Sequence, residues 1–409
     1  MMHYKFHCFA GRLKGFVELY QYQGGTAMDR KLRMGMVGGG TGAFIGGVHR
    51  MAAMLDGRIE LVCGAFSSTP EKSRKSGREL FLPEERIYGD YKEMFKTEKE
   101  LSPSERMDFV SIVTPNSTHY PVAKAAMESG FDVVCDKPLA LTLAEAKMLR
   151  KKVGVSGALF CLTHNYTGYP MVKQAKEIVK KGEIGKIRRV VVEYPQGWMA
   201  SPLESEGMKQ ALWRTDPKLA GSSFTMGDIG THCANLLEYI TGLHIEKVYA
   251  RLNTFVRGRK LDDDGSVLLD LGGGAHGLLW ASGIAVGEEN GLNIRVYGEK
   301  GSLRWRQEEP NTLEVRWTDK PGHVIRTGTP SALKAANDST RLPAGHPEGF
   351  IEAFANLYKN FADALLKKLS GKKADSGAFD FPGIEEGVRG MAFIEGVVKS
   401  SKTNKWVKV

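Results

Sequence analysis

The chain has 409 residues, of which 42% are hydrophobic and 25% charged, and its formal net charge at pH 7 is +10. This composition indicates a globular protein long enough for two domains, each with its own core. No run approaches eighteen apolar residues, so no membrane span is expected, and the basic residues are scattered, so nucleic acid is not an expected partner.

The N-terminal segment 1–30 differs from the rest of the chain. It has no long apolar stretch and no twin-arginine pair, so we expect an extension rather than a secretory signal, with the folded domain starting near Lys31. Its His3 and His7 are too weak a pattern to predict a metal site. The cysteines form no CxxC pair and predict reduced, structural thiols in a cytoplasmic protein: Cys8, Cys63, Cys135, Cys161 and Cys233.

Strands and helices alternate over residues 31–155. The strands are expected at Leu32–Val37, Ile59–Phe66, Phe109–Val113 and Asp132–Cys135. The helices are expected up to Leu55, after Thr69-Pro70, and at Tyr120–Ser129 and Leu143–Val153. This order predicts an α/β domain with a doubly wound parallel sheet covered on both faces, as in Rossmann folds.

Residues 156–409 are richer in strands. "ALFCLTHNY" (158–166) predicts one more strand and Met171–Lys181 a helix. Further strands are expected at Ile187–Tyr194, Glu246–Phe255, Ser266–Leu271, Ala275–Ala281, Leu292–Tyr297 and Leu303–Arg306, and helices at Ile351–Leu369 and Ile384–Ser401. Three glycines, 272–274, predict a hairpin turn. We expect an α+β domain with a large, open, mostly antiparallel sheet, and closing helices that can pack back on the first domain.

A glycine-rich loop joins the first strand to its helix. Gly38-x-Gly40-x-x-Ala43 fits the G-x-G-x-x-G/A pattern, in which backbone N–H groups approach a pyrophosphate at a helix N-terminus. A turn that binds no ligand is the alternative interpretation. The candidate cofactor contacts are Gly38, Gly40, Gly42, Phe44 and Ile45.

The end of the second strand reads "AFSSTPEK". NAD-binding folds often place an acid there for the ribose 2′-OH, but Phe66, Ser67 and Ser68 are not acidic. Small hydroxyls accept either ribose, so Ser67 and Ser68 are candidate cofactor contacts and both NAD and NADP stay open.

Three later motifs indicate a catalytic cluster. "VTPNSTH" (113–119) and "CDKPLA" (135–140) follow strand ends, where open parallel sheets bind ligands. "GDIGTHCANLLEY" (227–239) places Asp228 and His232 four residues apart, which on a helix puts both on one face. Taken alone, Lys137 fits a surface lysine, Asp228 a helix cap and His232 a buried structural histidine. Together, behind a dinucleotide loop, they favour catalysis.

These motifs resemble the glucose–fructose oxidoreductase / inositol dehydrogenase / rhizopine-catabolism (Gfo/Idh/MocA) family, from about Arg33 to the C-terminus. The resemblance rests on the glycine loop, "TPNSTH", "GDIGTH", and "DKP" where the family usually has Glu-Lys-Pro. "WRTDP", "GRKLDDD" and "VYGEKGSLRW" are similar to a branch that includes levoglucosan dehydrogenase and enzymes that oxidise glycosides at C3.

The resemblance implies hydride transfer between NAD or NADP and a secondary alcohol of a sugar, anhydrosugar, glycoside or cyclic polyol. An inositol-type dehydrogenase, a ketose reductase and an NAD(P)-sensing regulator without turnover are the alternatives. It also implies that residues 156–409 bind substrate and form a homodimer or homotetramer through the exposed sheet, because an uncovered face needs a partner.

The resemblance also assigns roles. Lys137 would bind the reacting hydroxyl, His232 would be the general base, and Asp228 would bind substrate or orient the other two. Asp136 keeps the family's charge but is one methylene shorter. The further cofactor candidates are Thr114, Pro115, Asn116, His119, Asp136 and Lys137, and the substrate candidates are Asn165, Tyr166, Trp213 and Arg214.

Alternatives remain for several of these residues. His119 can contact backbone only, and Trp213 with Arg214 can be a packing tryptophan beside a surface arginine. We expect Asp262-Asp263-Asp264 to be a solvated acidic run rather than a metal site.

Overall fold

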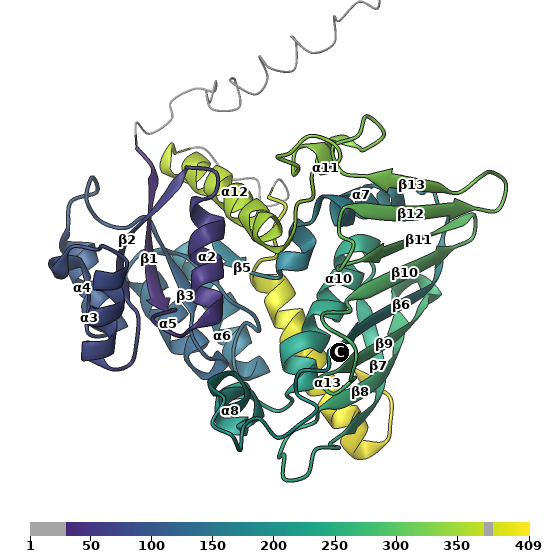
Figure 1. Cartoon of the computed structure of the whole chain (residues 1–409), viewed down its shortest axis with the longest axis horizontal. Helices are drawn as coiled ribbons and strands as arrows, with labels where there is room; N and C mark the ends of the chain where they lie inside the picture. Colours follow the sequence, from purple (N-terminus) through teal and green to yellow (C-terminus); the bar gives the residue numbers. More distant parts are fainter. Residues whose placement is uncertain (1–29, 372–378) are drawn as a thin grey trace, which may run out of the picture.

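The computed structural model describes residues 30–371 and 379–409. The predicted extension, apart from Arg30, lies outside these residues, as do His3, His7 and Cys8. Two sheets, each with its own helices, make up the described chain (Figure 1).

The first sheet has five parallel strands in the order β2-β1-β3-β4-β5. They span Leu32–Gly38 (β1), Ile59–Ala65 (β2), Phe109–Val113 (β3), Asp132–Cys135 (β4) and Phe160–Leu162 (β5). The predicted doubly wound sheet is confirmed, and its fifth strand lies beyond the boundary expected at residue 155. The strand order reverses direction between β1 and β3, so their carboxyl ends form the crevice where such sheets bind ligands.

The connecting helices of this half are Phe44–Met54 (α2), Pro70–Glu79 (α3), Tyr91–Glu100 (α4), Asn116–Glu128 (α5) and Leu143–Ser156 (α6), with a 3-10 turn at Glu84–Arg86. Helix α5 begins four residues before the predicted start at Tyr120. The early start was missed because Pro121 lies inside the helix and a proline there usually marks a boundary.

The second sheet has nine strands in the order β13-β12-β11-β10-β6-β9-β8-β7-β14, and of its described pairs only β6 and β9 run in parallel. The strands are Ile187–Pro195 (β6), Ile245–Asn253 (β7), Asp264–Leu271 (β8), His276–Ser282 (β9), Asn293–Gly298 (β10), Gly301–Arg306 (β11), Thr312–Trp317 (β12), His323–Arg326 (β13) and Val407–Lys408 (β14). The large, mostly antiparallel sheet is confirmed, and Gly272–Gly274 makes the predicted turn between β8 and β9. Strands β12, β13 and β14 were not predicted.

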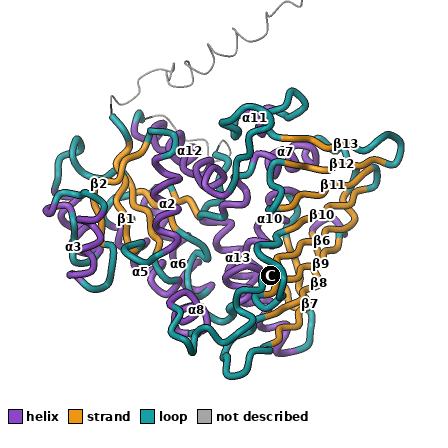
Figure 2. The backbone as a smooth tube through the Cα atoms, in the orientation of Figure 1, coloured by secondary structure: helices purple, strands orange, loops and turns teal. Residues whose placement is uncertain are grey.

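Helices lie along one face of this sheet (Figure 2). They include Pro170–Lys180 (α7), Thr231–Thr241 (α10) and Ile384–Thr403 (α13). The shorter elements are the 3-10 turn Asn165–Gly168, Lys209–Thr215 (α8), Pro217–Ala220 (α9), the π-helical turn Met226–Gly230 and Lys334–Asn337 (α11). "ALFCLTHNY" is therefore not one long strand: β5 ends at Leu162 and the chain turns at Asn165.

Helix α12 (Phe350–Leu369) follows most strands of the second sheet in the chain but packs beside α2, a helix of the first sheet (Figure 1). Its Phe354, Tyr358 and Phe361 share one buried cluster with Met34 and Phe109. A C-terminal segment therefore contributes to the core of the first sheet. In the described chain, no helix combines the length and apolar character needed to cross a bilayer.

Candidate active site

The glycine loop after β1 adopts conformations that favour glycine. Gly38, Gly39 and Gly42 have positive φ angles of 85°, 71° and 78°. A Cβ on Gly46, in the first turn of α2, would lie 2.3 Å from the Cα of Gly39. The helix therefore packs directly on the loop, and a larger residue at position 46 would separate them.

The loop fits the pyrophosphate of a dinucleotide. No side chain caps the start of α2 at Ala43, so the first helical N–H groups are open to an anionic ligand. A Cβ on Gly42 would meet nothing within 4 Å, whereas one on Gly40 would lie 2.6 Å from Ser76 Oγ. Gly42 thus borders open space and Gly40 packs on α3, while Phe44 is exposed and Ile45 half-buried.

The segments after β2 and β3 border the same crevice. Ser67 is half-buried and Ser68 exposed, and Ser67 Oγ accepts the N–H of Thr69. Thr114 follows β3 and keeps a buried hydroxyl oxygen that has no hydrogen-bond partner in the part of the chain described here. Pro115 is exposed beside it.

The side chains of Asn116 and His119 form hydrogen bonds with backbone carbonyl groups of this chain. Asn116 Nδ2 donates to the carbonyl of Ala220 at 3.0 Å. The two ring nitrogens of His119 face the carbonyls of Pro138 and Thr114 at 2.7 and 2.9 Å. His119 is buried, and burial lowers its pKa. Both of its hydrogen-bond contacts are to backbone, which was the alternative interpretation of this residue.

Lys137 and Asp228 meet between the two sheets. Lys137 Nζ donates to Asp228 Oδ1 at 2.9 Å and to the Asp228 carbonyl at 2.7 Å. Arg214 Nε donates to the other carboxylate oxygen at 2.8 Å. Burial acts to raise the pKa of Asp228, but Arg214 and Lys137 outweigh it and hold the pKa well below its usual range. Asp228 is therefore a carboxylate shared by two cations.

The four-residue spacing predicted that Asp228 lies on a regular α-helix, and the structure differs from that prediction. Asp228 lies in the π-helical turn Met226–Gly230, which precedes α10 and in which Thr231 N–H bonds the carbonyl of Met226. Such turns widen the helix and often mark functional sites. Here the Asp228 carbonyl is an acceptor for Lys137, a contact that the sequence pattern did not predict.

His232 follows on α10 and is 6% exposed. Its ring lies edge-on to Tyr166 at 4.7 Å and to His164 at 5.3 Å between centroids. Burial, with smaller contributions from Lys137 and His164, holds the pKa of His232 well below its usual value. The imidazole is therefore neutral near pH 7, the form in which a histidine accepts a proton. No hydrogen bond joins it to Asp228 in the described structure; Asp228 bonds Lys137 and Arg214 instead.

Two family models match the sequence that carries the glycine loop and this cluster. The oxidoreductase family with an NAD-binding Rossmann fold matches residues 32–164, and the GFO/IDH/MocA C-terminal domain matches residues 172–304. The chain belongs to the Gfo/Idh/MocA family.

Individual relatives agree with this assignment. The oxidoreductase YfiI of Bacillus subtilis (strain 168) is 34% identical over 390 residues, 94% of this chain and 98% of that one. An inositol dehydrogenase homolog from Azotobacter vinelandii, solved with NADH and myo-inositol, is 35% identical with a TM-score of 0.86 over 93% and 98% of the chains. Levoglucosan dehydrogenase, solved with NADH and levoglucosan, is 25% identical with a TM-score of 0.79 over 93% and 100%.

In this Gfo/Idh/MocA chain one predicted substrate residue, Tyr166, packs against His232. Asn165 is buried, and its Nδ2 has no hydrogen-bond partner within the described ranges. Tyr166 OH contacts Tyr194 OH, and burial raises the pKa of Tyr166 to about 12. Burial also lowers the pKa of the neighbouring His164 to about 3. Burial among these side chains, together with the nearby Lys137, therefore keeps His232 uncharged.

Arg214 is not an isolated surface arginine, because it packs against two tryptophan rings and pairs with Asp228. Its guanidinium lies 4.2 Å from the ring centroid of Trp213 and 5.7 Å from that of Trp198. It also donates to the Gln210 side chain at 2.7 Å. Trp213 therefore packs the guanidinium that holds Asp228. Trp198, 36% exposed after β6, was not predicted.

The acidic run 262–264 is not solvated, and that expectation was wrong. Asp262 is 7% exposed and Asp263 is fully buried. Asp262 accepts from Ser223 Oγ at 2.8 Å and from the N–H of Thr225, just before the π-helical turn. Asp263 pairs with Arg259 at 3.3 Å. No cluster of three or more His, Cys, Asp or Glu side chains suited to a metal occurs among the described residues.

Proposed function

We propose that this protein is an NAD(P)-dependent dehydrogenase that oxidises a secondary alcohol of a sugar, anhydrosugar, glycoside or cyclic polyol. The observation that carries the proposal is the Lys137–Asp228–Arg214 cluster beside a neutral, buried His232, next to the dinucleotide crevice. A nicotinamide cofactor, held by the glycine loop, Thr114 and the segment around Ser67, supplies the hydride acceptor when bound.

The chain's own residues handle the proton and the orientation of substrate. The Lys137 ammonium donates a hydrogen bond to the reacting hydroxyl oxygen and stabilises the negative charge that develops there. His232 takes the hydroxyl proton as general base. Asp228, fixed by Arg214, orients Lys137 and accepts from a neighbouring substrate hydroxyl. In the reverse direction the protonated His232 returns its proton to the alkoxide oxygen.

The choice between NAD and NADP rests on Ser67 and Ser68. No acid directly follows β2, so nothing at these positions repels a 2′-phosphate, and both hydroxyls accept a ribose. We therefore propose that either cofactor can bind, and the assay below includes both.

Two relatives support the substrate class, because one was solved with myo-inositol and another with levoglucosan. An inositol-type dehydrogenase and a ketose reductase are narrower forms of the same proposal. An NAD(P)-sensing regulator is disfavoured, because the complete set Lys137, Asp228 and His232 has no use without turnover.

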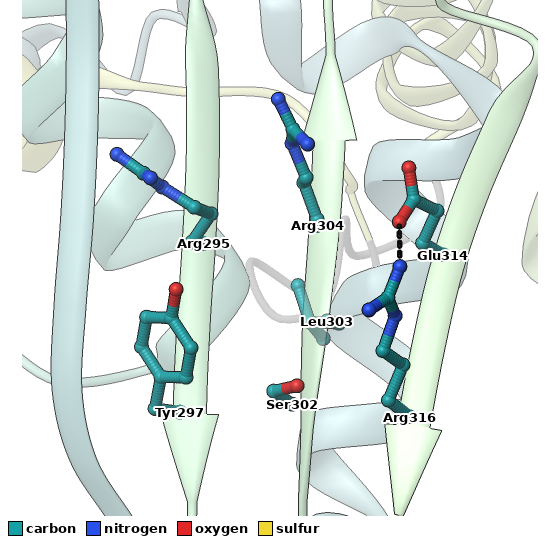
Figure 3. Close-up of a pocket in the computed structure, with 7 residues that line it drawn as sticks. All are labelled: Arg295, Tyr297, Ser302, Leu303, Arg304, Glu314 and Arg316. Carbon is teal, nitrogen blue, oxygen red and sulfur yellow. Dashed lines mark hydrogen bonds and ion pairs between the residues drawn. The ribbon is translucent and has the colours of Figure 1, made fainter. Parts of the chain in front are cut away.

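We also propose assembly through the open face of the nine-stranded sheet. Figure 3 shows side chains of both signs there, from adjacent strands: Arg295 and Arg304, and Arg316 donating to Glu314 at 3.1 Å. A two-fold interface brings each such patch against its own copy, where opposite charges can pair. The four described cysteines are free thiols, which suits a cytoplasmic dimer or tetramer.

The test is reduced-nicotinamide absorbance with NAD or NADP and a panel of sugars, inositols and anhydrosugars. Wild type is compared with Lys137→Ala and His232→Ala. We expect turnover of at least one polyol and a fall of about 10²–10⁴-fold in both variants. Tight cofactor binding without turnover of any panel member would instead support a regulator.

A further inference from the structure

His49 is a buried histidine of α2 that none of the roles above uses. It is fully buried, and its ring packs against Phe354 of α12 at 5.0 Å between centroids. Its Nδ1 lies 2.8 Å from Tyr358 OH and 3.3 Å from Ser111 Oγ. Its Nε2 is buried and has no hydrogen-bond partner among the described residues. One side of the ring is thus fixed by α12 and β3, and the other is unsatisfied.

The unsatisfied nitrogen faces the residue beside Lys137. His49 Nε2 lies 3.9 Å from Asp136 Oδ1. That distance is too long for a hydrogen bond but short enough for a strong charge–dipole interaction in a buried site. The same oxygen accepts the backbone N–H of Lys137 at 3.0 Å and the hydroxyl of Thr163 at 2.9 Å. Asp136 therefore connects His49 to the backbone of the catalytic lysine.

The hydrogen bonds fix the direction of this chain of groups. An ionised carboxylate only accepts, so the ring nitrogen facing it must carry the proton. With the proton on Nε2, Nδ1 is free to accept from Tyr358 OH, which lies 2.8 Å away. Ser111 Oγ lies 2.9 Å from Tyr358 OH and can donate to the phenol oxygen in turn. In this arrangement Ser111 donates to Tyr358, Tyr358 donates to His49, and the N–H of His49 faces Asp136.

The charge on Asp136 agrees with this arrangement. Burial acts to raise the pKa of Asp136, but His49, Lys137 and His119 outweigh it and hold the pKa below its usual range. The carboxylate therefore remains ionised in a site where its side chain is only 14% exposed.

We propose that His49 is a positioning residue that holds the Asp136 carboxylate and, through it, the backbone of Lys137 in the geometry that hydride transfer needs. The aspartate at this position is short enough to accept from the N–H of the next residue, and His49 fixes its orientation from the protein side. Tyr358, on helix α12, faces the other ring nitrogen of His49 and favours the tautomer protonated at Nε2. The expected effect on kcat rests on the proposed function, whereas the contact between His49 and Asp136 does not depend on it.

Two substitutions of His49 by amide residues distinguish the contribution of Nε2 from that of Nδ1. The amide of His49→Gln can reach the Nε2 position and donate to Asp136, whereas that of His49→Asn can reach only the Nδ1 position beside Tyr358. We expect His49→Asn to lower kcat by about 10- to 100-fold with little change in substrate KM, and His49→Gln to recover most of kcat. His276→Asn, at an exposed position at the start of β9, is the control that leaves kcat unchanged.

The contact itself is measured without turnover. In ¹⁵N-histidine NMR spectra the His49 signals, assigned by their loss in His49→Gln, should show an Nε2-protonated ring that changes in Asp136→Asn. Equal kcat in both His49 variants, or His49 signals unaffected by Asp136→Asn, would overturn the inference. If wild type turns over no substrate but the NMR coupling is present, the proposed function fails and the contact stands.

Discussion

The glycine loop and the Lys137–Asp228–Arg214 cluster, which we propose act on the same bound cofactor and substrate, are built by different means. The loop works through backbone: three positive φ angles and the contact of Gly46 with Gly39 leave space and N–H groups for a ligand. The cluster works through side-chain charge brought together from the ends of β4 and α8 and from the π-helical turn. One region should therefore govern cofactor affinity, and the other the chemical step.

The largest expected effect separates these two functions at Lys137. Lys137→Met should lower kcat by about 10²–10⁴-fold, because the reacting oxygen loses its cation and Asp228 keeps only Arg214. NADH affinity, measured by fluorescence energy transfer, should change by less than about 3-fold. Lys147→Met, on the exposed face of α6, is the matched control. A parallel loss of NADH binding would break the distinction between the regions.

A second prediction concerns Asp262, which accepts hydrogen bonds from Ser223 and Thr225 just before the π-helical turn that carries Asp228. Burial raises the pKa of Asp262 to about 6, above its ordinary value of 3.8. Its contribution to stability is therefore fully present below about pH 4 and is lost as the pH rises through about 6. At about 1.4 kcal/mol per unit of pKa difference, the change is of order 3 kcal/mol.

Urea unfolding at pH 4.5 and 7.5 measures about 2 kcal/mol of this change, because the unfolded carboxyl is already partly ionised at pH 4.5. Wild type should lose stability relative to Asp262→Asn as the pH rises, whereas Asp319→Asn, at an exposed turn, should follow wild type. Parallel pH dependences in wild type and Asp262→Asn would mean that Asp262 is not a buried, high-pKa carboxyl.

The third prediction tests the backbone region. Gly46→Ala places a methyl group 2.3 Å from Gly39 Cα, so α2 must move away from the loop. At a strain of about 1–3 kcal/mol, the Kd for NADH should rise by about 10- to 100-fold, while kcat at saturating cofactor stays within about 3-fold. Gly47→Ala is the matched control, because a Cβ there meets only Arg50 Nη2 at 4.0 Å. Similar affinities in both variants would contradict a role for the Gly39–Gly46 contact.

The same contrast explains what the sequence could predict. The glycine loop and the β1–β4 strands are local patterns of turn residues and buried apolar runs, and these were predicted nearly to the residue. The members of the cluster were predicted from their motifs, but its geometry required tertiary information. The π-helical turn has no spacing signature that distinguishes it from the α-helix expected for Asp228 and His232. Gly227 and Gly230 were the available signal, since a Cβ on Gly230 would lie 2.6 Å from Met226 Sδ.

Burial of charge was the other missing information. Asp262 and Asp263 look like a hydrophilic turn until Ser223, Thr225 and Arg259 are seen to surround them. His49 looks like one polar residue on an amphipathic helix, and its partners Ser111, Asp136 and Tyr358 are 62 to 309 positions away in the chain. The two edge strands that were not predicted, β13 and β14, are only four and two residues long and carry too few residues for an alternation. Strand β12 (TLEVRW) does alternate, and the prediction did not include it.

The most direct test of the central claim, that a neutral His232 beside the charged cluster is the general base, is the pH dependence of kcat/KM for alcohol oxidation by wild type. Because the pKa of His232 is held well below 6.5, protonation should remove the base only at low pH, and kcat/KM should show no acid limb between pH 8 and pH 6. An acid limb with an apparent pKa at or above about 6.5, lost in His232→Ala, would show that His232 titrates as an ordinary histidine and would contradict the account.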